Sequence, residues 1–93
     1  MKTDEFSFQV RVETRTQTGE VVAVYLQVRE GKVKTTKECA EGAAFADYDK
    51  DGRLLGIELL GPCRVGVLDR IARHAPAKRF VREAVPRGML VGA

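Results

Sequence analysis

The sequence has no tryptophan, no asparagine, a single serine (Ser7), two cysteines and three prolines among its 93 residues. Two cysteines are too few for a secreted scaffold held by disulfides. The lone serine does not lie in a G-x-S-x-G nucleophile elbow, and no glycine-rich phosphate loop precedes an expected helix. No apolar run approaches the roughly 20 residues that span a bilayer. Because catalysis and cofactor binding have no support in the sequence, we predict neither.

The length and composition indicate one small folded domain, residues 1–93. Apolar residues make up 44% of the chain and charged residues 31%, which is typical of a globular protein. A chain of this length has room for one core only. The first residues, MKTDEFSF, are acidic where a signal peptide needs basic residues and then an apolar stretch. We therefore expect a cytoplasmic protein with no membrane partner.

The pattern of residues 1–62 predicts a five-stranded antiparallel β-meander. Apolar and polar residues alternate along residues 6–12, which is typical of a strand with one face buried. Residues 21–28 are apolar and β-branched on both faces, as in a central strand. Further strands are expected over residues 32–39, 43–48 and 53–60, separated by short returns.

Residues 63–93 predict two short amphipathic helices. Gly61-Pro62 ends the β-region, and apolar residues then recur at helical spacing, first over residues 67–75 and again over residues 77–85. Two such helices must bury their apolar stripes against the sheet. The expected fold class is therefore α+β, with both helices packed on one face.

The same argument predicts a homodimer through the sheet. Two short helices cover only one face, whereas residues 21–28 present apolar side chains on both. An exposed apolar patch usually marks an interface, and a two-fold dimer is the commonest solution. Two alternatives stay open: a different protein partner, or a monomer in which the N-terminal strand or the tail Met89-Leu90-Val91 covers the second face.

The segment Asp47–Glu58 satisfies the calcium-loop pattern D-x-[DN]-x-[DN]-G-x₅-E. A calcium loop of this type lies between two helices. The segment before Asp47 is too short for a helix, and Gly61-Pro62 follows too soon for a second one. We therefore predict a hairpin with an acidic turn, whose carboxylates point largely to solvent and hold no ordered metal. Binding of a metal or small molecule by Asp47, Asp49, Asp51 and Glu58 remains the alternative.

Residues 20–62 resemble the short bacterial proteins called domain of unknown function 2283. The resemblance is carried by Tyr25-Leu26 in a strand and by the stretch DYDKDGRLLGIELL that begins at Asp47. The family strand often has Asp where this chain has Val22, so a polar site using that Asp would be incomplete here. The resemblance implies a β-rich fold with Gly56-Ile57-Glu58 on its last strand, and it implies no activity. The helical segment extends beyond the resemblance.

Glu58 and Tyr25 are the candidate ligand-binding residues. A carboxylate in the middle of an apolar strand has a raised pKa unless it is paired, which makes Glu58 a candidate acid or base. The other interpretation is a cross-strand ion pair or a position on the open face of the sheet. Cys39, Cys63 and His74 are too widely spaced to indicate a zinc site or an activated thiol. We interpret the cysteines as small apolar core residues.

The basic charge is concentrated in the expected helices. Residues 1–62 carry nine Lys/Arg and eleven Asp/Glu, whereas residues 63–93 carry seven and two, which gives net charges of −2 and +5. Candidate phosphate-binding side chains are Arg70, Arg73, Lys78, Arg79 and Arg82. A solvated helix surface with the pairs Asp69/Arg73 and Arg79/Glu83 explains the same residues. We thus expect a non-catalytic interaction or self-associating module, with a nucleic-acid-associated module as the alternative.

Overall fold

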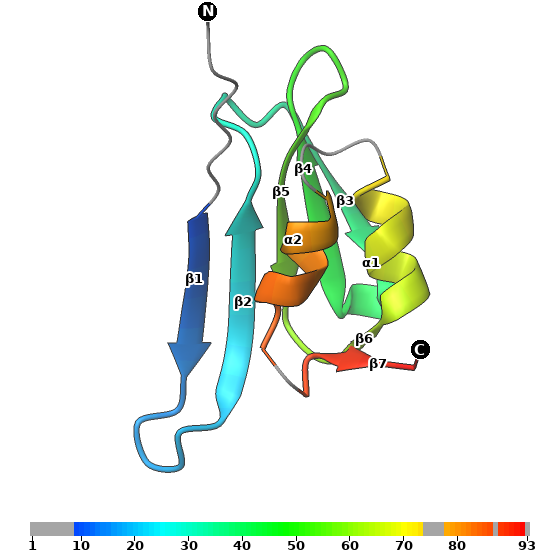
Figure 1. The fold of residues 1–93 in the computed structure, drawn as a ribbon. Coiled ribbons are helices and arrows are strands. Elements are labelled where there is room, and N and C mark those ends of the chain that lie inside the picture. Colours follow the sequence, from blue (N-terminus) through cyan, green and yellow to red (C-terminus); the bar gives the residue numbers. More distant parts are fainter. Residues whose placement is uncertain (1–8, 74–77, 87, 93) are drawn as a thin grey trace, which may run out of the picture.

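The computed structural model describes residues 9–73, 78–86 and 88–92, which form an α+β fold (Figure 1). In these residues a five-stranded antiparallel sheet is followed by two short helices and a small two-stranded sheet, which confirms the predicted fold class. The elements are β1 (Gln9–Thr14), β2 (Val21–Gln27), β3 (Thr35–Cys39), the 3₁₀ turn Ala40–Gly42, β4 (Ala44–Tyr48), β5 (Leu54–Leu59), β6 (Cys63–Arg64), α1 (Val65–Ile71), α2 (Lys78–Ala84) and β7 (Leu90–Val91).

The strand order is β1-β2-β5-β4-β3, so the sheet is not a simple meander. β1 and β2 form one hairpin, β3 to β5 form a meander, and β2 pairs with β5. Residues 28–34 therefore cross from β2, which lies beside the β1 edge, to β3 at the opposite edge of the sheet. Lys34 N–H donates to Tyr48 O at 2.8 Å where this connection joins β3. Short loops alone suggested a meander, because local sequence does not reveal a pairing between distant strands.

The helices cover one face of the sheet, as predicted. Leu68, Ala72, Val81 and Val85 from the helical segment share one cluster with the inward side chains of β2, β4 and β5. The largest fully buried side chains are Leu26, Ile57, Leu59, Leu68, Val24 and Val81. The core therefore lies between the helices and the three central strands, and the opposite face has no helix over it in the described residues.

A β-bulge changes the expected facing of β5. Asp47 pairs with Gly56, but the next residue, Tyr48, pairs with Leu54, so Leu55 has no partner on β4. Leu54 therefore joins the core cluster, although strict alternation would place it on the other face. Leu55 is buried against Gly31 of the crossover connection: a Cβ on Gly31 would lie 2.8 Å from Leu55 Cδ2.

β1 is more exposed than its alternating pattern predicted. Val10 and Val12 retain 40% and 43% of their surface. Both valines are on the helix-side face, because they pair with Leu26 and Val24. β1 nevertheless lies to one side of both helices (Figure 1). Phe6 and Phe8, which shared the predicted stripe, lie outside the described residues.

The C-terminal helices are shorter than the predicted ranges, and a short strand follows them. Each helix has seven residues, and β7 pairs in parallel with β6 through Cys63–Leu90 and Arg64–Val91. The Met89-Leu90-Val91 tail therefore lies beside β6 and does not cover the open face of the large sheet. In the described residues, neither helix has the length and apolar character needed to cross a membrane.

Candidate functional site

The open face of the sheet carries a row of side chains that runs across all five strands. In register order these are Arg11, Tyr25, Glu58, Phe45 and Glu38. The row begins with a cation on β1 and ends with an anion on β3. Two aromatic side chains flank the central carboxylate. This mixed polar and aromatic face is the first candidate site.

Asp47 connects three strands on this face. Its carboxylate accepts a hydrogen bond from the Tyr25 hydroxyl at 3.1 Å and another from Thr36 Oγ1 at 2.6 Å. Gly56, opposite Asp47 on β5, makes the first contact possible, because the Tyr25 ring lies where a side chain at 56 would begin. The prediction that Asp47 points largely to solvent is wrong. Sequence reasoning also missed Thr36, although a glycine inside a strand signals a close approach by another group.

Burial and the neighbouring charge of Asp47 raise the pKa of Tyr25 above its usual value of 10.0. The Arg11 guanidinium lies 5.5 Å from the centroid of the Tyr25 ring and opposes this shift. Tyr25 therefore stays protonated at neutral pH and acts as a hydrogen-bond donor. The Tyr25 hydroxyl donates to Asp47 of the same chain. A structural role is therefore sufficient to explain Tyr25.

Glu58 lies on the open face between Tyr25 and Phe45 and is half-buried. Its neighbours in the chain, Ile57 and Leu59, point into the core. Among the described residues, Glu58 has no ion pair within 4.0 Å. The open-face interpretation of Glu58 therefore fits, whereas the cross-strand pair with a Lys or Arg does not.

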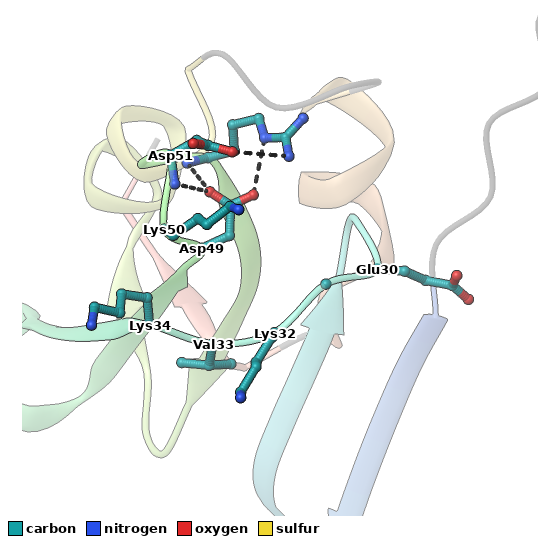
Figure 2. Close-up of a pocket in the computed structure, with 9 residues that line it drawn as sticks. Glu30, Lys32, Val33, Lys34, Asp49, Lys50 and Asp51 are labelled. Atoms are coloured by element: carbon teal, nitrogen blue, oxygen red, sulfur yellow. Dashed lines mark hydrogen bonds and ion pairs between the residues drawn. The ribbon is translucent and has the colours of Figure 1, made fainter.

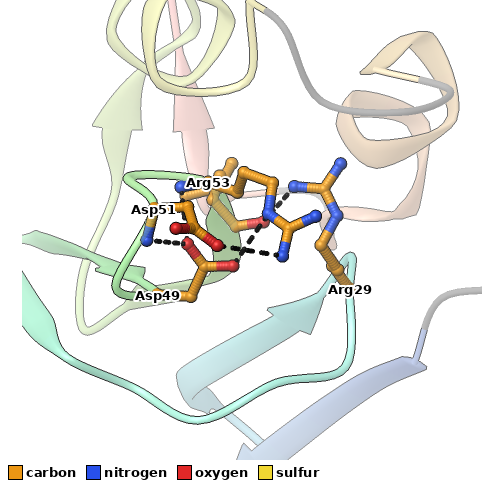
Figure 3. Close-up of polar contacts among 5 residues, drawn as sticks. Arg29, Asp49, Asp51 and Arg53 are labelled. Atoms are coloured by element: carbon orange, nitrogen blue, oxygen red, sulfur yellow. Dashed lines mark hydrogen bonds and ion pairs between the residues drawn. The ribbon is translucent and has the colours of Figure 1, made fainter.

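The β4–β5 turn is organised by Asp49, which is only 9% exposed. Its Oδ1 accepts hydrogen bonds from the backbone N–H groups of Asp51 and Arg53, each at 2.9 Å. Its Oδ2 accepts a hydrogen bond from Arg53 Nε at 2.9 Å (Figure 3). Arg29 approaches from the crossover connection and donates to Leu54 O at 3.3 Å. The prediction that Asp49 faces solvent is wrong, because the turn directs several donors at this carboxylate. These hydrogen bonds hold the pKa of Asp49 below its usual 3.8, with the Arg53 N–H as the largest cause.

We expect Asp49→Ala to lower the melting temperature by roughly 4–8 °C, and Asp49→Asn to lower it less. Asparagine keeps an oxygen for the two backbone N–H groups but loses the charge that faces Arg53. Because the folded-state pKa of Asp49 is depressed, the charge stabilises the fold above the unfolded pKa near 3.8 and ceases to do so as pH falls through the lower folded value.

Thermal unfolding followed by circular dichroism from pH 7 to pH 2 measures this effect. The difference between wild type and Asp49→Asn should be constant above about pH 5 and shrink below about pH 4. A difference that does not change with pH would contradict the assigned role of the Asp49 charge.

The acidic segment does not form a calcium loop in the described residues, where no three His, Cys, Asp or Glu side chains are grouped to hold a metal ion. Asp49 and Asp51 lie in the turn, whereas Glu58 lies on the open face in the middle of β5. The turn and the crossover connection border a groove with Lys32, Lys34 and Lys50 on its walls. The side chains of Glu30 and Lys34 extend to opposite sides, away from Asp49 (Figure 2). The charges of Glu30 and Lys34 therefore do not converge on Asp49.

The cysteines match the interpretation as small apolar residues. Cys63 is buried in the core, and burial raises the pKa of its thiol above the usual 9.0. A catalytic thiol needs the opposite shift. Cys39 is half-buried at the end of β3. His74, the third member of the widely spaced set, lies outside the described residues.

Among the described candidate arginines of the basic helices, Arg82 forms an ion pair. Arg70, Arg73 and Arg82 are exposed. Arg82 Nη1 pairs with Asp69 Oδ2 at 3.1 Å and joins α2 to α1. The predicted Asp69/Arg73 pair is absent from the described residues, because α1 ends at Ile71 and Asp69 has Arg82 as its partner. The structure does not describe the side chains of the other two predicted phosphate contacts, Lys78 and Arg79. The predicted Arg79/Glu83 pair therefore also lies outside the described residues.

Comparison with known proteins finds one family that the strands β2 to β5 resemble. Residues 20–61, which include β2 to β5, match the family model described as "Protein of unknown function (DUF2283)". Tyr25, Asp47, Gly56 and Glu58 all lie within the match, whereas β1 and the helices lie outside it. No curated protein and no solved structure gives a significant match. Over residues 20–61, the chain is therefore similar to the DUF2283 family of proteins of unknown function.

Proposed function

We propose that this protein is a non-catalytic module that self-associates, with two copies joined through their sheets. The observation that carries the proposal is the incomplete covering of the large sheet. Both helices pack on the central strands, and β1 keeps exposed valines on the helix side, Val10 at 40% and Val12 at 43%. Apolar side chains on an uncovered strand are typical of an interface.

The state of the candidate chemical groups supports a non-catalytic role. Asp47 and Asp49 accept hydrogen bonds from neighbouring side chains or backbone and thereby hold strands and a turn together. The pKa of the Cys63 thiol is raised by burial, which disfavours the nucleophilic thiolate. Each of these groups has a structural role that explains its position.

The small size of the domain supports self-association. A chain of 93 residues buries only about 60–65% of the surface that its unfolded form exposes, so its stability is marginal. Burying the exposed valines of β1 against a second copy adds apolar contact without any change of fold. Binding of the second copy also stabilises the folded state by mass action.

Sedimentation equilibrium of the full chain at several micromolar concentrations tests the proposal. We expect a mass that approaches twice the 10.3 kDa of one chain as the concentration rises. A mass that stays at 10.3 kDa over the whole range would refute self-association.

A further inference from the structure

Among the residues that the structure describes, no strand pairs with the outer edge of β1. Arg15 N–H donates to Glu20 O at 2.8 Å, across the β1–β2 hairpin. Backbone groups of an antiparallel strand alternate in direction from residue to residue. The odd-numbered residues of β1 therefore face β2, and the N–H and C=O groups of Val10, Val12 and Thr14 point away from the sheet.

The neighbouring strand gives the same assignment independently. Val28 N–H donates to Leu55 O at 2.9 Å, so even-numbered residues of β2 direct their backbone groups toward β5. Odd-numbered residues such as Tyr25 then face β1, where Tyr25 pairs with Arg11. In the described residues β1 is the end of the strand order, so no strand occupies its outer side.

The side chains of β1 are arranged so that a second copy fits them. Val10 and Val12 lie on the helix side, and Arg11 and Glu13 lie on the open face. All four are exposed. Arg11 and Glu13 flank Val12 symmetrically and have opposite charges. When a second copy of this strand is rotated by a half-turn about Val12, Arg11 of each copy lies opposite Glu13 of the other.

We propose that two copies pair antiparallel through their β1 edges, with the two-fold axis at Val12. This inference rests on the proposed self-association and names its contact surface. Val12 of each copy exchanges two backbone hydrogen bonds with the partner's Val12, because these groups point outward. Arg11 then lies opposite the partner's Glu13, and Glu13 opposite the partner's Arg11.

The pairing joins two five-stranded sheets into one continuous sheet. A two-fold axis perpendicular to the sheet keeps the helices of both copies on the same side. The Val12 side chains of the two copies then meet in the gap between the two helical layers, and Val10 of each copy lies opposite the partner's Thr14. A register centred on Arg11 would instead place two arginines opposite each other, and like charges in that position are destabilising.

Charge reversal distinguishes this register from other modes of association. Arg11→Glu places the new carboxylate opposite the partner's Glu13, and Glu13→Arg places the new guanidinium opposite the partner's Arg11. Each clash occurs twice because of the two-fold axis, so we expect either variant alone to dimerise roughly 10- to 30-fold more weakly than wild type.

An equimolar mixture should regain the wild-type affinity as a heterodimer, because one chain then presents two carboxylates to the two guanidinium groups of the other. Glu38→Arg, an exposed change on the opposite edge of the sheet, is the matched control and should dimerise like wild type.

Sedimentation equilibrium of the two variants, alone and mixed, decides the outcome. Recovery of the dimer on mixing supports the β1 contact and shows that both variants are folded. Variants that dimerise like wild type, or a mixture that stays monomeric, would overturn the register while self-association of the wild type stands. A wild type that is monomeric throughout would overturn the proposed function as well.

Discussion

Ile57→Ala is expected to lower the free energy of unfolding by about 2–5 kcal/mol. Ile57 is fully buried, and it lies between Leu26 on β2 and Ala46 on β4 in the centre of the sheet. The alanine side chain leaves a cavity that the paired strands on both sides cannot close. Because small domains have only about 5–15 kcal/mol of stability, this loss removes a substantial fraction of it.

Denaturant unfolding at one low protein concentration measures this loss. Ile57→Val is the matched control, and it should cost only about 0.5–1.5 kcal/mol because it removes a single methyl group. If the alanine variant were no less stable than the valine variant, the position of Ile57 in the core would be wrong.

The second large effect is expected for Gly56→Ala, at about 1–3 kcal/mol of destabilisation. A Cβ at this position would collide with the Tyr25 hydroxyl and lie 2.6 Å from Tyr25 Cζ and 3.2 Å from Leu26 O. The Tyr25 side chain must move away, which breaks its hydrogen bond to Asp47. The backbone oxygen of Leu26 has little freedom to move, so relief is incomplete.

A double-mutant cycle with Tyr25→Ala identifies the cause of the loss. In the Tyr25→Ala background the ring is absent, so Gly56→Ala should cost much less than in the wild type. Equal costs in the two backgrounds, measured by denaturant unfolding, would show that the glycine is required for another reason.

The strands and helices were predictable where local chemistry decides them. β-Branched residues identified β2, Asp-Gly identified the β4–β5 turn, and Gly61-Pro62 marked the end of the large sheet. The family resemblance was also visible in the sequence, and the match over residues 20–61 confirms it. These features depend on neighbouring residues only.

The remaining features depend on contacts between distant residues. Pairing of β2 with β5 places Tyr25 beside Gly56, and no local pattern indicates which strands become neighbours. The bulge at Leu55 reverses the facing of Leu54. Asp49 looked like a solvent-exposed turn residue, yet its burial follows from the fold of the turn around it. Val12 is likewise exposed because β1 lies to one side of both helices (Figure 1).

Hydrogen exchange at the Val12 amide tests the proposed β1 contact most directly. In a single copy this N–H points outward, whereas the amides of Arg11 and Glu13 face β2. In the proposed dimer the Val12 amide donates to the partner's Val12. We expect Val12 exchange, followed by NMR, to slow markedly as the protein concentration rises. Exchange at Val12 that stays equally fast in a sample shown to be dimeric would contradict pairing through β1.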